Sequence, residues 1–313
     1  MLELFRTPNY DFISKRKWAY LASALFILVG AISLIARGGL RADIDFAGGT
    51  LVQVRFEQPP TIDKIRAALG TVGLGDSVIQ EFGDSREFII RLKLGEGTGD
   101  AGNTVRQALA RDTTLGSFEI RRAEFVGPQV GRDLQLQALY AVLAGLAGIL
   151  IYVAVRFDLK GGVTAIIAQT HDVLIALGAL SLTNREFSLP VLAALLTVIG
   201  YSVNDKIVAY DRVRENRQRA GALRGQPFAT QINTAINQTL SRTILTGLSV
   251  LFAAGVLYLF GGKVLEDFAF TLIVGVIAGT YSTVYIAAAL IVDWTAWEAS
   301  RRVARGPKSA VKT

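Results

Sequence analysis

Six apolar segments, each long enough to cross a bilayer, constrain this chain more than any other feature. They are residues 18–36, 134–155, 163–182, 189–210, 243–260 and 268–292. A helix of about 20 apolar residues spans the hydrocarbon core of a bilayer, and only a helix satisfies the backbone of a single such segment within itself. The sequence therefore predicts an α-helical polytopic membrane protein with six transmembrane helices.

Composition narrows the chemistry that this chain can perform. It has no cysteine and one histidine, which excludes disulfides, thiol chemistry and multi-histidine metal sites, so no cofactor or metal is expected. The net charge of +7 would suit a nucleic-acid-binding protein. The positive residues lie in the loops that flank the apolar segments, however, so no nucleic acid partner is expected.

The segment between the first two spans, residues 37–131, is polar and rich in turn residues. Its patterns predict strands at 50–56, 77–82, 87–94 and 117–125 and short helices at 61–69 and 103–110. The order β-α-β-β-α-β is that of a ferredoxin-like α+β domain. The glycine-rich stretch 95–102 is interpreted as a plain loop, because it lacks the Gly-Lys-Ser/Thr ending of a phosphate-binding loop.

Loop charge predicts the orientation. The cationic segments comprise residues 1–17, the short loop after 155, the basic loop 211–237 and the tail 294–313. All of them fall on one side if both termini are cytoplasmic. The α+β domain is then extracytoplasmic, and residues 132–293 form a five-helix bundle in the membrane.

Asp205, near the cytoplasmic end of the fourth span, is the main candidate for function. A carboxylate at the centre of a membrane helix costs roughly 2.5–3.5 kcal/mol, so a helix that carries one usually uses it. Arg242 enters the next span from the same side and is the best candidate partner. Two interpretations stay open at this stage: a proton-linked ion pair, and a static buried pair that joins two helices.

The other polar groups at membrane depth are His171, Asp172, Asn204 and Lys206. Lys206 points about 100° away from its neighbour Asp205, and snorkelling toward the cytoplasmic surface is favoured over pairing with Asp211 or Asp172. His171 and Asp172 either support a helix interface or belong to a proton relay with Asp205. As neighbours on a helix they face different directions, so a catalytic dyad is not expected.

No nucleophile stands near these groups in a motif, so the sequence does not indicate an enzyme. Gly145 and Gly148 make a small-residue face suited to close helix packing.

Seven motifs together resemble one family over nearly the whole chain. They are DFAGGT at 45–50, VGPQVG at 126–131, His171-Asp172, VIGYSVND at 198–205, DRVREN at 211–216, SRT at 241–243 and YLFGG at 258–262. The chain is similar to SecF members of the SecD/SecF family of protein-export membrane proteins, whose architecture resembles the RND transporters. It departs from that family at Lys206, where a small hydroxyl residue is common.

The resemblance implies a subunit that pairs with SecD beside the SecYEG channel, with YajC and YidC as further candidate partners. The pair would use the proton motive force to promote translocation and release of a preprotein on the outer side. Asp205 and Arg242 fall on the family's functional intramembrane positions. Two alternatives stay open: an RND-type proton-coupled exporter of a small molecule or lipid, and a non-energised scaffold for SecD and insertion factors.

Overall fold

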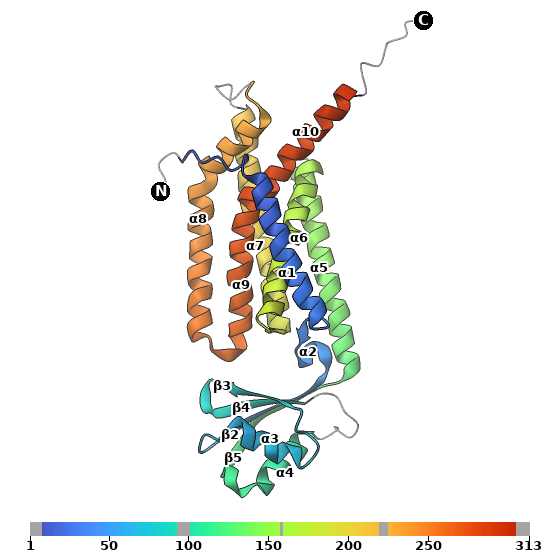
Figure 1. Cartoon of the computed structure of the whole chain (residues 1–313), viewed down its shortest axis with the longest axis vertical. Coiled ribbons are helices and arrows are strands. Elements are labelled where there is room, and N and C mark those ends of the chain that lie inside the picture. Colours follow the sequence, from blue (N-terminus) through green and yellow to red (C-terminus); the bar gives the residue numbers. More distant parts are fainter. Residues whose placement is uncertain (1–7, 93–100, 157–158, 219–224, 305–313) are drawn as a thin grey trace, which may run out of the picture.

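The computed structural model describes residues 8–92, 101–156, 159–218 and 225–304. Long helices form a bundle, and a small α+β domain lies at one end of it (Figure 1). The start of α1 and the end of α10 lie at the opposite end of the bundle (Figure 1). In the described part, six helical segments are long and apolar enough to cross a membrane. The predicted fold class is confirmed.

The first five spans are single helices. They are α1 (Arg16–Ala36), α5 (Pro128–Arg156), α6 (Leu159–Leu182), α7 (Leu189–Gln218) and α8 (Phe228–Phe260). Helices α7 and α8 extend well into the predicted basic loop 211–237. A helix that has already formed gains a hydrogen bond with each added residue, so the change from apolar to polar side chains does not end it.

The sixth span changes its winding partway along. It consists of α9 (Gly262–Ser282), a π turn η3 (Thr283–Ala287) and α10 (Ala288–Ala304). A π turn carries an extra residue and so rotates the side chains that follow it. It begins directly after Ser282, a residue that contacts the buried charges described below.

Close helix contacts occur where two glycines or a glycine and a small side chain meet. A Cβ added to Gly30 of α1 would lie 2.7 Å from the Cα of Gly178 in α6, and one added to Gly279 of α9 would lie 2.8 Å from the hydroxyl of Ser202 in α7. On the predicted packing face of α5, a Cβ at Gly148 meets nothing within 4 Å, and one at Gly145 lies 4.0 Å from a methyl group of Leu196 in α7. Small residues in a sequence permit close helix packing, but they do not show which helices pack closely.

The α+β domain contains β2 (Gly49–Phe56), α3 (Ile62–Gly70), β3 (Val78–Phe82), β4 (Asp84–Leu92), α4 (Ala101–Arg111), the 3₁₀ turn η2 (Thr113–Leu115) and β5 (Phe118–Val126). Its antiparallel sheet has the order β3-β4-β2-β5, which is ferredoxin-like. Part of the glycine-rich stretch, residues 95–100, lies outside the described residues, and Gly102 is inside α4.

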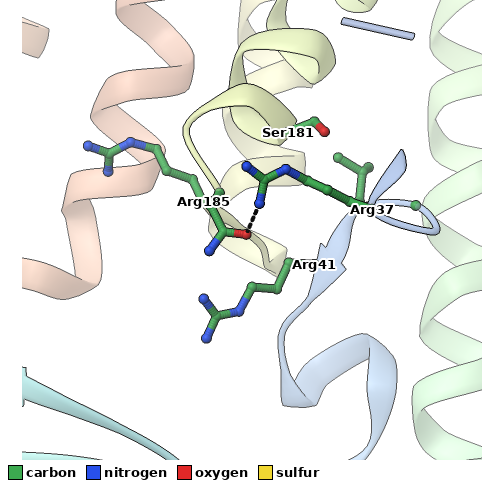
Figure 2. Close-up of a pocket in the computed structure, with 7 residues that line it drawn as sticks. Arg37, Arg41, Ser181 and Arg185 are labelled. Atoms are coloured by element: carbon green, nitrogen blue, oxygen red, sulfur yellow. Dashed lines mark hydrogen bonds between the residues drawn. The ribbon is translucent and has the colours of Figure 1, made fainter. Parts of the chain in front are cut away.

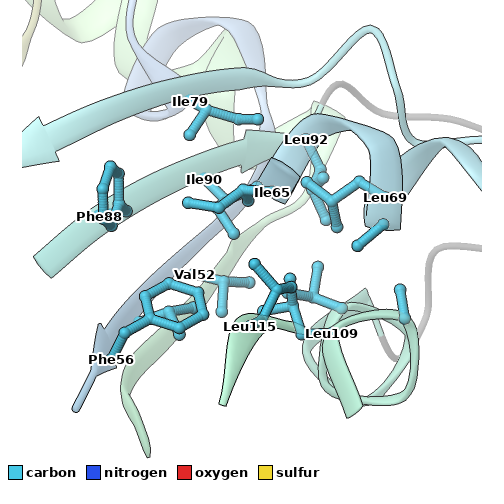
Figure 3. Close-up of a cluster of buried hydrophobic side chains, with 14 of the residues drawn as sticks. Val52, Phe56, Ile65, Leu69, Ile79, Phe88, Ile90, Leu92, Leu109 and Leu115 are labelled. Carbon is cyan, nitrogen blue, oxygen red and sulfur yellow. The ribbon is translucent and has the colours of Figure 1, made fainter. Parts of the chain in front are cut away.

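The core of this domain follows from alternation along β2. Val52, Val54 and Phe56 point to the same face and are buried against Phe88 and the apolar sides of α3 and α4 (Figure 3). Phe56 and Phe88 meet edge to face at 5.8 Å. The domain thus has its own hydrophobic core, separate from the helix bundle.

Among the described residues, three connections join the domain to the bundle. One is the chain between α1 and β2, which includes the strand β1 (Arg41–Ala42) and the one-turn helix α2 (Ile44–Ala47). The second is the start of α5, where Gly131 lets the backbone approach the carbonyl oxygen of Phe46. The third is a parallel pairing of β1 with β6 (Glu186–Phe187) in the turn between α6 and α7.

Candidate functional site

A fully buried ion pair lies at the centre of the bundle. Lys206 of α7 donates to Oδ2 of Asp172 of α6 over 3.0 Å, and both side chains are 0% exposed. Helix α6 alone would leave the Asp172 carboxylate in an apolar layer, and α7 alone would do the same to the Lys206 ammonium. Their contact leaves the pair with no net charge in the low-dielectric interior.

Hydroxyl groups complete the surroundings of the Asp172 carboxylate. Ser202 of α7 donates to Oδ2 over 2.6 Å, and Ser282, at the end of α9, donates over 2.9 Å. The Lys206 ammonium also donates to the hydroxyl of Ser202. Three helices therefore converge on a single carboxylate, which is a strong constraint on how they pack.

His171 extends this cluster toward α1. Its Nδ1 lies 3.0 Å from Oδ1 of Asp172, and its Nε2 lies 3.0 Å from the hydroxyl of Ser23. With its proton on Nδ1, the ring donates to Asp172, and the single hydroxyl proton of Ser23 is shared between His171 Nε2 and the Tyr281 hydroxyl, 3.3 Å away. The ring also stacks on Tyr281, whose hydroxyl donates to a backbone carbonyl of α1. The expectation that His171 and Asp172 face different directions is wrong, because their side-chain rotamers bring the two groups together.

Asp205 lies beside this cluster but outside it. Its side chain is 3% exposed, and its Oδ2 is buried without a hydrogen-bond partner. Another buried acceptor without a partner, Oε1 of Gln169, lies on α6, while the amide nitrogen of the same side chain donates to the carbonyl of Ile199. A carboxylate oxygen buried in this way is strongly disfavoured when ionised.

Arg242 does not contact Asp205. Its side chain is exposed on α8, and among the described residues no ion pair joins it to Asp205. Asn204 is also exposed, on the outer side of α7. The structure thus brings together His171, Asp172 and Lys206, and leaves Asp205, Asn204 and Arg242 outside their hydrogen-bonded cluster.

Lys206 also differs from its favoured prediction. It does not snorkel to the membrane surface, because the Asp172 carboxylate lies within reach of its ammonium group. Asp211, the other candidate partner, contacts Arg156 over 3.1 Å near the helix ends. Sequence reasoning missed the supporting hydroxyls of Ser23, Ser202 and Ser282; the one available signal was a hydroxyl side chain inside an apolar helix.

A second charged cluster lies where the α+β domain meets the turn between α6 and α7. Glu186 forms ion pairs with Arg91 of β4 and, over 3.0 Å, with Arg41 of β1. Arg91 also lies 3.4 Å from Asp43. Burial raises the pKa of Glu186 above its ordinary value, against the opposing effect of the two arginines. This cluster fixes the domain to the turn.

No group of three or more metal-ligating side chains occurs in the part of the chain that the structure describes. The arrangement of the spans is suited to holding or exchanging protons at carboxylates.

The fold and these groups define a polytopic membrane protein with a ferredoxin-like domain and ionisable side chains buried in its spans. Residues 105–297 match the family described as protein export membrane protein SecD/SecF, C-terminal, and residues 44–60 match the SecD/SecF GG motif. The chain belongs to the SecD/SecF family of protein-export membrane proteins.

Named relatives and solved structures agree with this assignment. Protein translocase subunit SecF of Desulfurispirillum indicum is 46% identical over 90% of this chain and 91% of its own length. The SecF subunit of Calditerrivibrio nitroreducens is 44% identical over 93% and 96%. The crystal structure of SecDF from Thermus thermophilus, a translocon-associated membrane protein, has a TM-score of 0.81 and 39% identity. That match covers 92% of this chain but 39% of the longer SecDF chain.

Proposed function

We propose that this chain acts with SecD to convert the proton motive force into preprotein translocation and release on the outer side of the membrane, through SecYEG. The observation that carries this proposal is the environment of the Asp205 carboxyl group. Its carboxyl group is buried in a membrane-spanning helix, and Oδ2 has no partner. A group whose charge is not fixed by a neighbour can change its protonation state during a working cycle.

The buried pair beside Asp205 supports this role. The helix turns Lys206 toward Asp172, and the ammonium group donates its hydrogen bonds to Asp172 and Ser202, not to Asp205. Asp205 is then the carboxylate that remains available for proton exchange, with His171 as a candidate relay through the Asp172 cluster. One proton crossing about 150 mV releases roughly 3.5 kcal/mol, enough to shift a two-state element substantially.

The outer surface of α7 and α8 supports a SecD partner. Polar side chains are exposed there on two adjacent helices: Thr197 and Asn204 on α7, and Arg242, Thr246 and Ser249 on α8. Polar and cationic groups at membrane depth are costly against lipid. We infer that SecD covers this surface and supplies a carboxylate near Arg242, with YajC and YidC as further candidate partners.

The orientation in this proposal places both termini in the cytoplasm and the α+β domain outside. The distribution of lysine and arginine among the loops supports it. The bundle then presents the start of α1 and the end of α10 to the cytoplasm (Figure 1). A preprotein would meet the domain after leaving the channel.

The test compares two substitutions in the same helix. Inverted membrane vesicles that contain SecYEG, SecD and this chain are assayed for preprotein import with and without a proton gradient. Asp205→Asn keeps shape but removes the titratable group, and we expect it to abolish the gain from the gradient. The control Asp211→Asn changes a half-exposed carboxylate two turns away and should retain the gain.

Arg242→Ala should resemble Asp205→Asn while SecD still co-purifies with the variant. Import at the wild-type level by Asp205→Asn vesicles, with its full response to the gradient, would overturn the proposal and favour a scaffold. Substrate flux in vesicles that contain this chain alone would favour a small-molecule or lipid exporter.

A further inference from the structure

A small cationic pocket lies at the end of the bundle that adjoins the α+β domain. Its volume is about 330 Å³, within the usual range for small-ligand sites. It lies between the end of α1 and the end of α6, and Figure 2 shows Arg37, Arg41, Ser181 and Arg185 around it. The remaining lining residues are Gly39, Leu40 and Asn184. Three arginines therefore line the pocket, without any carboxylate among these lining residues.

The three arginines differ in how far their charges are compensated. Arg185 turns away from the pocket, as Figure 2 shows, and pairs with Asp267 and, over 3.0 Å, with Glu266. The charge of Arg41 is partly compensated, because the Glu186 carboxylate lies 3.0 Å from one end of its guanidinium group. Of the three lining arginines, Arg37 is therefore the one without a carboxylate partner among the described residues.

Arg37 donates over 2.8 Å to the amide oxygen of Asn184, and this neutral contact leaves its charge uncompensated in the described part of the chain. The Asn184 amide nitrogen adds another donor. Ser181 is already engaged with Ser33 at 2.8 Å. The pocket therefore offers several N–H donors and one arginine whose charge no carboxylate neutralises in the described part of the chain, a combination suited to an oxyanion.

The position of Arg37 along the axis of the bundle indicates which kind of molecule would supply that anion. Arg37 follows directly on the membrane-spanning helix α1. Just before it, Ile32 and Ile35 are 57% and 81% exposed, as expected for side chains that face acyl chains. An anion at Arg37 would thus lie at the level of lipid headgroups, directly beyond the apolar surface.

We propose that this pocket binds the phosphate of an anionic phospholipid in the leaflet that adjoins the α+β domain. Arg37 and Arg41 donate to the phosphate oxygens, and the Asn184 amide orients Arg37. The bound phosphate links the end of α1 to β1, the segment that leads into the α+β domain. This assignment is independent of proton coupling, since it requires neither Asp205 nor a gradient.

The experiment measures lipid binding to the full chain in detergent by native mass spectrometry, with phosphatidylglycerol as the probe. Arg37→Gln should weaken binding about ten- to hundredfold, the range for a lost charge-assisted hydrogen bond. The control is Arg86→Gln, at an exposed arginine of the α+β domain that pairs with Asp84; it should bind as the wild type does.

A second variant guards against misfolding. Asn184→Asp preserves size and a backbone conformation with φ of 55° that Asp tolerates. It places a carboxylate against Arg37 and should abolish binding while the unfolding midpoint stays near that of the wild type. Unchanged binding by both variants would overturn the proposal. Displacement of the lipid by millimolar inorganic phosphate, with equal affinity, would overturn the lipid assignment and leave a soluble anion as the ligand.

Discussion

The Asp172–Lys206 pair permits a quantitative prediction, because its two charges are both fully buried and 3.0 Å apart. At an effective dielectric constant of about 20, their attraction is roughly 5.5 kcal/mol. Asp172→Asn removes one charge and leaves the Lys206 ammonium buried alone, so we expect the free energy of unfolding to fall by about 3–5 kcal/mol. Lys206→Met should cost less, because Ser202 and Ser282 still donate to the carboxylate.

The double variant completes a double-mutant cycle measured by unfolding in mixed SDS micelles. Removing both charges should cost less than the sum of the single losses, with a coupling energy of at least about 2 kcal/mol. The control cycle uses the half-exposed pair of Arg156 and Asp211, 3.1 Å apart, whose coupling should stay below about 1 kcal/mol. Equal couplings for the two pairs would refute the reasoning that burial makes the first one strong.

Three further predictions test packing and electrostatics elsewhere. Gly30→Ala should destabilise the protein by about 1–3 kcal/mol, because the new methyl group meets backbone at 2.7 Å. Gly148→Ala should stabilise it by about 0.5–1 kcal/mol, because the new methyl group there meets nothing within 4 Å. Thermal unfolding of both variants in detergent compares them. Asn237→Ala should free the N-terminal segment that it holds through two 2.8 Å bonds to Tyr10, seen as faster backbone hydrogen exchange there. For Glu186, the folded-state pKa lies above the ordinary 4.5, so wild-type stability relative to Glu186→Gln should fall as pH rises from about 4.5; a relative gain would contradict the sign.

The spans and the ferredoxin-like order were predictable because each rests on a local periodicity. Strand β2 alternates buried and half-buried positions, and α3 places Ile65 and Leu69 on one face. The membrane helices are identified by length and composition alone. The two-residue strands β1 and β6 were missed, because such short segments carry no measurable period.

The pairing of charges was not predictable for a geometric reason. Sequence position gives the height of a residue in its helix, which is why Arg242 was chosen as the partner of Asp205. It does not give the rotation of one helix against another, and this rotation turns Arg242 outward. The same rotation places Lys206 against Asp172, a residue 34 positions away in sequence. Asp205 stays a prediction as the proton site.

The pairing of β1 with β6 limits how the α+β domain can move. The connections at the end of α1 and the start of α5 would alone define a hinge axis, about which the domain could swing freely. The ladder from Arg41 to Phe187 and the bond from the Asp43 amide to the Phe187 carbonyl fix the first of these connections to the corner between α6 and α7, and the ion pair of Glu186 with Arg91 holds β4 there as well. A large rotation of the domain would stretch these contacts and must break them first. Any large reorientation of this domain should therefore be an all-or-none event that begins with the detachment of this strand pair from the corner between α6 and α7.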